Sequence, residues 1–185
     1  MTIKERINRW RHDRGYGVHS PLAFRIVRDV LSPQRGYALY GYDDIGSLFH
    51  GENTRLKERR GRFLLRLGAA MQPSTVWHSS GFPKEYLESL KLAGGIIRIY
   101  DGEIFPEEMM KAEMILVEKK LPKDIGKILK KPGLTIVCLD VGEKNVARLA
   151  TKLDTGVMFD AVDSAMIITG SGISPMVYTV SKWKI

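Results

Sequence analysis

Residues 74–102 read STVWHSSGFPKEYLESLKLAGGIIRIYDG, and this stretch decides the fold. It holds two short apolar runs, Thr75 to His78 and Ile96 to Tyr100, on either side of a helical pattern over Lys84 to Leu92. Strands that are apolar on both faces are typical of a parallel sheet covered by helices on both sides. A strand, a helix and a second strand in this order predict one βαβ unit.

The same alternation continues along the chain. Met114 to Val117 and Leu134 to Leu139 are further strand candidates, and Lys123 to Lys130 and Lys144 to Leu153 carry helical patterns. Crossover helices between strands place neighbouring strands parallel. The sequence therefore predicts an α/β fold with a doubly wound, Rossmann-like sheet that is mostly parallel.

The C-terminal part breaks this alternation. Val157 to Thr169 and Met176 to Trp183 are two strand-like runs, joined by Gly170 to Pro175 without a helix. Consecutive strands that lack a crossover helix pair in antiparallel fashion. We expect these two runs to form a C-terminal antiparallel hairpin at one edge of the sheet.

The N-terminal third is predicted to be helical, with helices over Thr2–His12, Pro21–Leu31 and Arg55–Met71. Ser20 followed by Pro21 is a helix start, because a hydroxyl caps free N–H groups and proline suits the first helical position. A chain of 185 residues with 44% hydrophobic content is long enough for one core. We therefore expect a single domain over 1–185, with a helical extension over 1–72 and a core over 73–185.

The first predicted helix has an unusual pattern. Ile3, Ile7 and Trp10 lie four and three residues apart and form one apolar stripe on an otherwise charged helix. Such a stripe needs something to pack against.

Positive charge is concentrated in this N-terminal part. Residues 1–66 hold 14 Lys and Arg against 7 Asp and Glu, whereas residues 67–185 hold 15 against 14. One interpretation is a solvated helical face. The other is a surface for an anionic partner or nucleic acid, which clustered cations attract.

The composition indicates a cytoplasmic location and gives no sign of a disulfide or a metal site. The chain has a single cysteine, Cys138, in an apolar run, so no intrachain disulfide can form. No run of about 18 apolar residues and no apolar leader is present, so we expect a cytoplasmic protein without a membrane partner. The four histidines lie apart from one another, so no metal site is predicted.

Ligands of doubly wound sheets bind outside the carboxyl ends of the strands. Ser79, Ser80 and Gly81 follow the first predicted strand, where glycine backbone and hydroxyl groups can approach a nucleotide or nucleoside. One glycine is a much weaker signal than a glycine-rich loop. An ordinary strand-to-helix turn capped by serine explains these residues equally well.

Two further candidates follow the next strands. Asp101 and Gly102 end the second strand, where an acid would accept hydrogen bonds from ribose hydroxyls, although Asp-Gly is also a common turn. Glu118 ends the third apolar run and can act as a base or hold an amino group. Its neighbours Lys119 and Lys120 also allow a simple surface ion pair.

Three stretches resemble one family: Tyr16 to Phe24 with its Gly-Val-His-Ser-Pro motif, the helix over Arg59 to Leu67, and the strand pattern from Thr75 onward. The chain is similar to Bacteroidetes-type class I S-adenosylmethionine-dependent methyltransferase-like proteins. That resemblance implies a seven-stranded Rossmann-like sheet with S-adenosylmethionine over the ends of the first, second and fourth strands, and no metal.

The resemblance also implies site residues. Ser79, Ser80 and Gly81 match the glycine-rich first loop of that family, and the pair Asp101 and Gly102 matches the acid and glycine that hold the ribose.

Departures from the family pattern indicate a degenerate and shortened member. Only Glu103 to Glu113 separate the ribose acid from the next strand, which leaves room for one short helix over Pro106 to Ala112 but not for a third strand. The adenine side of the pocket is then open or remodelled. Glu118 and Lys119 replace the Asp expected at the next strand end, whereas Asp140 keeps its expected place.

Two functions follow from this reasoning. The first is a methyltransferase-like protein whose incomplete cofactor pocket is formed by Ser79 to Gly81, Asp101 and Glu118. Such a protein either acts on an unknown acceptor or is retained as a pseudoenzyme. The alternative is a noncatalytic Rossmann-like binding or interaction module that uses its basic N-terminal helices. The edge strand exposed by the missing strand is also compatible with a homodimer.

Overall fold

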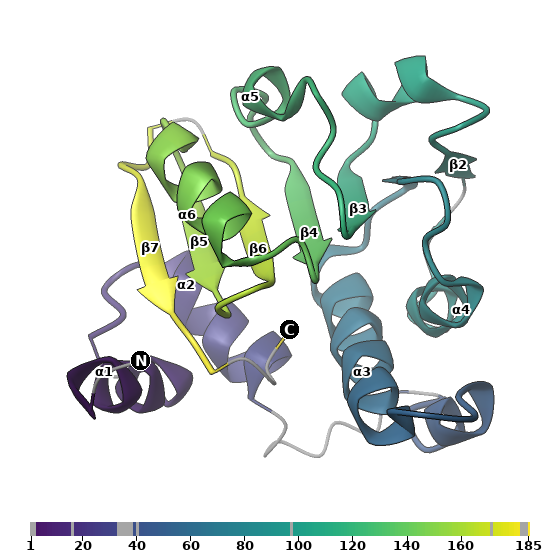
Figure 1. Ribbon diagram of the computed structural model, residues 1–185, viewed down its shortest axis with the longest axis horizontal. Helices are drawn as coiled ribbons and strands as arrows, with labels where there is room; N and C mark the ends of the chain where they lie inside the picture. Colours follow the sequence, from purple (N-terminus) through teal and green to yellow (C-terminus); the bar gives the residue numbers. More distant parts are fainter. Residues whose placement is uncertain are drawn as a thin grey trace.

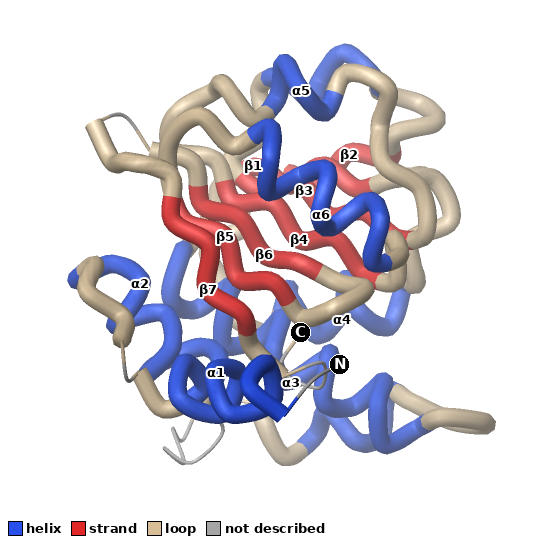
Figure 2. Tube along the Cα trace, turned by 60° about the vertical axis from the view of Figure 1, so that its left-hand side comes forward, coloured by secondary structure: helices blue, strands red, loops and turns tan. Residues whose placement is uncertain are grey.

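The computed structural model describes residues 3–15, 17–32, 39, 41–96, 98–170, 172–181 and 185. It shows a seven-stranded sheet with helices on both faces (Figures 1 and 2). Thr2 of the predicted first helix, Tyr16 of the predicted N-terminal motif and Ser171 of the predicted connection between the last two strands lie outside the described residues, as do Ile97 and residues 182–184 of predicted strands. The strands are β1 (Thr75–His78), β2 (Arg98–Asp101), β3 (Met114–Glu118), β4 (Thr135–Leu139), β5 (Val157–Asp160), β6 (Ala165–Ile168) and β7 (Met176–Thr179).

Helices occupy most of the N-terminal third and the connections between the parallel strands. Short 3-10 or π segments are named η; η1 continues α2, and η2 and η3 lie in connections between other elements. The helices are α1 (Ile3–Asp13), α2 (Pro21–Ile26), η1 (Val27–Leu31), η2 (Asp44–Leu48), α3 (Thr54–Met71), α4 (Lys84–Lys91), η3 (Pro106–Met110), α5 (Ile125–Ile128) and α6 (Glu143–Lys152).

The sheet has the strand order β2-β1-β3-β4-β6-β5-β7. The first four of these strands are parallel, and β6 is antiparallel to both of its neighbours, β4 and β5. From β1 the chain runs outward to β2, then crosses back to β3 on the other side of β1. This reversal makes the sheet doubly wound, so the predicted Rossmann-like α/β fold class is confirmed.

The predicted loss of a strand agrees with the edge of the sheet. β2 is the outermost strand and pairs with β1. Among the described residues between β2 and β3, the one regular segment is the short helix η3 (Pro106–Met110), close to the predicted short helix. Eleven intervening residues hold that helix and its connections, and they leave no length for another parallel strand.

An antiparallel hairpin is present near the C-terminus, but the predicted pairing of the runs Val157 to Thr169 and Met176 to Trp183 is wrong. The run from Val157 to Thr169 divides into β5 and β6, which pair antiparallel with each other. A tight turn separates them, because Asp160 Oδ1 accepts the Val162 N–H at 2.7 Å and Ala161 N–H donates to the Ser164 carbonyl at 2.9 Å. β7 then passes β5 and pairs with it in parallel, not antiparallel, register.

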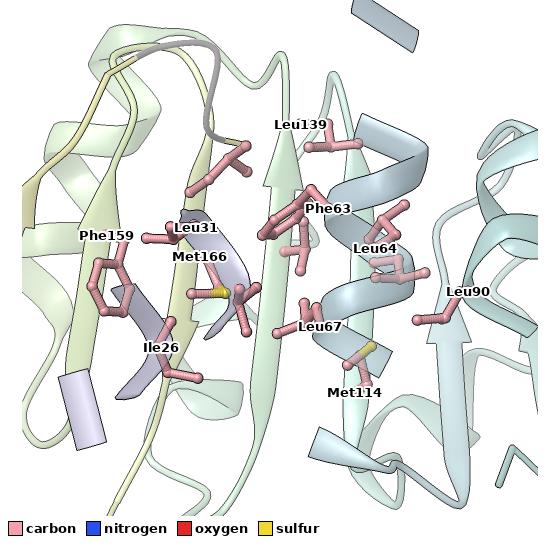
Figure 3. Close-up of a cluster of buried hydrophobic side chains, with 14 of the residues drawn as sticks. Ile26, Leu31, Phe63, Leu64, Leu67, Leu90, Met114, Leu139, Phe159 and Met166 are labelled. Atoms are coloured by element: carbon pink, nitrogen blue, oxygen red, sulfur yellow. The ribbon is translucent and has the colours of Figure 1, made fainter. Parts of the chain in front are cut away.

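Two apolar layers hold the helices on the sheet. On one face, Phe63, Leu64 and Leu67 of α3 join a buried cluster with Met114 of β3 and Met166 of β6 (Figure 3). Each of these side chains is at most 1% exposed, and full burial of such a group stabilises the fold by about 1.5–3 kcal/mol. The N-terminal helices therefore share a core with the sheet.

The second layer covers the opposite face. Ile115 of β3 and Ile136 of β4 lie in a separate buried cluster with Ile128 of α5 and Leu149 of α6. Figure 2 shows α6 on the side of the sheet that faces the viewer, with α3 and α4 on the far side. The sheet is thus the middle layer of three, which leaves the ends of its strands as the place for a site.

The N-terminal helices agree with the sequence in one respect and differ in another. Ser20 caps α2, since its Oγ accepts the Ala23 N–H at 3.3 Å, as predicted. The apolar stripe of Ile3, Ile7 and Trp10 does not pack against the described part of the protein, because all three residues are exposed and α1 has no buried residue. The polar side of α1 faces β7 instead.

Candidate ligand-binding site

A cavity of about 390 Å³ lies at the switch point of the sheet, outside the carboxyl ends of β1, β3 and β4. Its volume falls in the range of small-molecule pockets, and its position is where doubly wound sheets bind ligands. The loops after these strands supply Gly81, Pro83, Glu118, Lys119 and Asp140; the remaining lining comes from Phe49, His50, Asn53, Leu56, Lys57, Arg60, Glu85 and Tyr86.

A charged pair dominates one wall of the cavity. Arg60 reaches from α3 and donates from Nη1 and Nη2 to the two carboxylate oxygens of Asp140, at 2.7 and 2.6 Å. The Arg60 side chain is 6% exposed and that of Asp140 is 40% exposed. Burial by itself would lower the pKa of Arg60, but the hydrogen bonds and charge of Asp140 outweigh burial and raise it. This two-bond geometry fixes both side chains.

Tyr86 and Glu118 complete the polar wall. Tyr86 is 3% exposed, and burial raises the pKa of its hydroxyl; Arg60 opposes this shift, whereas Glu118 and Asp140 reinforce it. The phenol therefore stays neutral near pH 7. The Glu118 side chain is 12% exposed and forms an ion pair with Lys119 at 3.5 Å. The cavity thus offers fixed groups of both signs.

The backbone takes a left-handed conformation in each loop that enters the cavity from a strand end. Gly81 has a φ of +74°, Lys119 of +63° and Asp140 of +51°. Residues other than glycine rarely adopt this conformation, and such positions cluster at ligand sites. Lys119 and Asp140 directly follow β3 and β4, so these sharp turns present their side chains at the cavity.

The six residues predicted to bind the cofactor are divided by the structure. Gly81 and Glu118 line the cavity, and Ser79 lies just behind it, where its Oγ accepts the Glu118 N–H at 3.2 Å. Ser80 and Asp101 instead bond to one residue, Glu103. The Ser80 hydroxyl donates to the Glu103 carboxylate at 2.9 Å, and Asp101 Oδ1 accepts the Glu103 N–H at 2.9 Å.

Gly102 has no room for a ligand beside it. A Cβ added there would lie 2.2 Å from Cζ2 of Trp77, because the indole packs directly on the glycine. Trp77 Nε1 donates to the Phe105 carbonyl at 3.1 Å, and the Phe105 ring meets Tyr100 edge-on at 5.7 Å. The adenine side of the predicted pocket was expected to be open or remodelled. There, aromatic side chains fill the space.

Sequence reasoning missed Arg60 and Tyr86. Both lie on helices that were predicted, but neither follows a strand, so the search at strand ends passed over them. A signal for Arg60 was present: it stands three, four and seven residues before Phe63, Leu64 and Leu67, on the apolar side of its helix. A cation in that position must be buried with a partner.

Among the described residues, no group of three or more His, Cys, Asp or Glu side chains is arranged to hold a metal ion. In that same part of the chain, no helix is long and apolar enough to cross a membrane.

Comparison with known proteins gives little further information. No family model matches the chain, and no curated protein matches its sequence. Among solved structures, the chain is similar to mitomycin 7-O-methyltransferase MmcR, with a TM-score of 0.32 and 11% sequence identity. The match covers 78% of this chain and 62% of that one, so this chain spans less than two thirds of its length. A similarity of this size is too weak to support an argument about function.

Proposed function

We propose that this chain is a noncatalytic, methyltransferase-like protein that binds a small zwitterion in the cavity between Gly81, Glu118 and Asp140. The observation that carries the proposal is the position of the Arg60–Asp140 pair and Glu118 in one cavity at the switch point. The amino-acid end of S-adenosylmethionine is the candidate ligand that the family resemblance supplies.

The charges of the cavity suit such a ligand. Glu118 provides a largely buried carboxylate for an ammonium group, which would take the place of its present partner Lys119. Lys57 and Lys119 line the same cavity as partners for a carboxylate. Arg60 is already neutralised by Asp140, so its role is to hold the wall in place. Hydrogen bonds to charged groups contribute about 1.5–3 kcal/mol each, enough for binding of a small ligand.

The space for the adenosine part of the cofactor is reduced. The indole of Trp77 occupies the space beside Gly102, and one oxygen of Asp101 accepts the Glu103 N–H. Methyl transfer needs a complete cofactor held in line with its acceptor. We therefore derive no methyl-transfer step for this chain.

Isothermal titration with four ligands tests the proposal: S-adenosylmethionine, S-adenosylhomocysteine, methionine and adenosine. We expect methionine to bind within about tenfold of the two larger ligands, because the shared amino-acid end makes the contacts, and adenosine not to bind. Binding of adenosine but not methionine would reverse the assignment of the two halves. No binding of any ligand at millimolar concentration would end the proposal.

A second candidate function is an interaction module that contacts an anionic partner through residues 1–66. The observation in its favour is the distribution of cations, because not all of them are used inside the protein. Arg60 and Arg66 are buried, and Arg9 is tied to the sheet. Exposed cations remain together on the N-terminal helix and directly after it; they are Lys4, Arg6, Arg11 and Arg14.

A further inference from the structure

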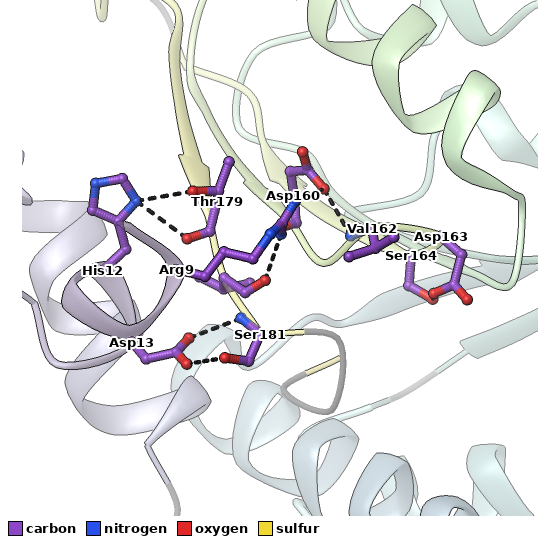
Figure 4. Close-up of polar contacts among 10 residues, drawn as sticks. Arg9, His12, Asp13, Asp160, Val162, Asp163, Ser164, Thr179 and Ser181 are labelled. Carbon is purple, nitrogen blue, oxygen red and sulfur yellow. Dashed lines mark hydrogen bonds and ion pairs between the residues drawn. The ribbon is translucent and has the colours of Figure 1, made fainter. Parts of the chain in front are cut away.

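Helix α1 is attached to the protein by its polar side. Arg9 Nη1 donates to the carbonyls of Asp160 and Val180, at 2.8 and 2.6 Å (Figure 4). Asp13 accepts the Ser181 N–H at 3.0 Å and also the Ser181 hydroxyl. These bonds involve the end of β5 and the residues that follow β7, so the helix lies against that end of the sheet.

A third polar contact supports the same arrangement. His12 Nδ1 lies 3.1 Å from the Thr179 carbonyl, and its ring meets Tyr178 edge-on at 5.6 Å. Arg9, His12 and Asp13 are each partly buried, whereas most other residues of α1 are exposed. The side of the helix that faces the protein is therefore polar.

The opposite side of α1 is apolar and open. Ile3, Ile7 and Trp10 are 76%, 50% and 52% exposed. With about 100° of rotation per residue, these three positions fall within about 60° of one another, and Arg9 lies about 100° or more away from each. The usual orientation of an amphipathic helix is thus inverted, and its apolar stripe points away from the body of the protein.

Cations border the stripe on both sides. By the same helical geometry, Arg6 lies along one side of it, and Lys4 and Arg11 lie along the other. Arg14 continues the stripe beyond Trp10, with its guanidinium 4.5 Å from the centre of the indole ring. All four cations are exposed. An apolar stripe between two cationic borders matches a surface that is apolar within and anionic at its face.

From this arrangement we propose that α1 binds the surface of an anionic phospholipid membrane, with Ile3, Ile7 and Trp10 inserted at the level of the headgroups. The helix keeps its polar attachment to β7, so binding requires no refolding. The inference rests on the second candidate function, and it replaces the expectation from the sequence that no membrane is a partner. It concerns a surface contact, which needs no spanning helix.

Charge favours lipid over the other partners of this stripe. A second copy of the chain would bring Arg6 and Arg11 against the same cations, which is unfavourable. Nucleic acid would attract the cations through its phosphates, but it offers no apolar surface on which Ile3 and Ile7 would be buried. The cytoplasmic leaflet, in the compartment that the sequence predicts, carries anionic lipids that attract each nearby cation.

Co-sedimentation of the full chain with vesicles tests the inference. Vesicles of phosphatidylcholine alone and of phosphatidylcholine mixed with phosphatidylglycerol separate apolar from electrostatic contributions. We expect binding to the anionic vesicles, at least about tenfold weaker binding to neutral ones, and loss with added salt. Equal binding to both vesicle types, or no binding to the anionic vesicles, would overturn the inference.

Two matched variants show whether the stripe is the contact. Ile7→Ser removes an exposed apolar group from α1 and should weaken vesicle binding about tenfold, while the melting temperature stays unchanged. Ile104→Ser removes a group that is 66% exposed elsewhere on the surface and should leave binding unchanged. Equal effects of the two variants would contradict the role of α1.

Failure of the inference can be separated from failure of the second candidate function. Binding of duplex DNA at low salt, lost in an Arg6→Ser, Arg11→Ser variant, without vesicle binding would keep the anionic-partner function and reject the membrane. A dimer that Ile7→Ser dissociates, in the absence of vesicle binding, would assign the stripe to a second copy. No binding to vesicles or DNA would reject both.

Discussion

The carboxyl ends of the strands form two regions that differ in how their polar groups are used. Beside β1 and β2, Ser80 and Asp101 bond to Glu103, and Trp77 fills the remaining space. Beside β3 and β4, Glu118 and Asp140 border a cavity of about 390 Å³. The region around Ser80, Asp101 and Trp77 is thus bonded and packed within the protein, and we call it the filled side. The region around Glu118 and Asp140 stays accessible, and we call it the accessible side.

The difference arises from the short connection between β2 and β3. Because no further strand pairs with β2 in the described part of the chain, the loop after β2 folds back over the strand ends and brings Phe105 to Trp77. Beside β3 and β4, the described residues leave the cavity open. There α3 supplies Arg60, which holds Asp140 at the edge of the cavity.

The largest expected effect comes from breaking the charged pair on the accessible side. Asp140→Asn leaves the Arg60 guanidinium buried without its counter-ion and should lower the free energy of unfolding by about 3 kcal/mol. Asparagine also tolerates the left-handed backbone at this position, so the effect reports on charge. Urea denaturation measures it.

Arg60→Met serves as the control for this prediction. It leaves Asp140, whose side chain is 40% exposed and can be hydrated, so it should cost clearly less than Asp140→Asn. The double variant should recover part of the loss. Equal losses of unfolding free energy in the two single variants would show that the burial of Arg60 does not determine the cost of breaking the pair.

The next largest effect concerns the filled side. Gly102→Ala places a methyl group 2.2 Å from the Trp77 ring and 2.8 Å from the His78 carbonyl, and it should destabilise the fold by about 2–3 kcal/mol. Gly81→Ala meets no atom within 4 Å and suffers only from its φ of +74°, so about 1 kcal/mol is expected. A larger loss of melting temperature for Gly81→Ala than for Gly102→Ala would contradict the close packing of Trp77 on Gly102.

Much of the fold could be predicted because the strands are short, apolar and separated by helices. β1 was predicted at its observed bounds, and the connection after Asp101 was correctly judged too short for a strand. The break between β5 and β6 was missed, although Asp160, Asp163 and Ser164 around Ala161 and Val162 are typical turn residues. The apolar residues on both sides made Val157 to Thr169 look like one continuous run.

The site was harder to predict than the fold. Strand-end reasoning found Gly81 and Glu118, because position after a strand is readable from the sequence. It could not find that Trp77 fills the space at Gly102, since that depends on how a distant loop folds. The burial of Arg60 was readable from its place on the apolar side of its helix, but its partner Asp140 was not, because that contact depends on tertiary packing.

A smaller effect is expected from pH on the accessible side. Burial raises the pKa of Tyr86 above that of an unfolded tyrosine, so the folded state holds this proton more tightly. The stabilisation is present below about pH 10 and is lost as pH rises through the higher folded pKa. Between about pH 9 and 11 the urea midpoint should fall more steeply for the wild type than for Tyr86→Phe. Parallel slopes would exclude Tyr86 as the titrating group.

The smallest effect is expected for the polar bonds of the filled side. Ser80→Ala removes an exposed hydrogen bond to Glu103 and should change the free energy of unfolding by less than about 0.5 kcal/mol. Packing of Trp77 would then account for most of the stability of this region. A loss above about 1 kcal/mol, measured by urea denaturation, would show that the polar bonds close this side.

The central claim is that the accessible side alone binds the ligand, and calorimetric titration of two isosteric variants with S-adenosylmethionine tests it most directly. Glu118→Gln removes a carboxylate of the cavity, and Asp101→Asn removes the carboxylate of the filled side. We predict that Glu118→Gln weakens binding about tenfold and that Asp101→Asn leaves it unchanged. A loss of affinity in Asp101→Asn with none in Glu118→Gln would contradict this account.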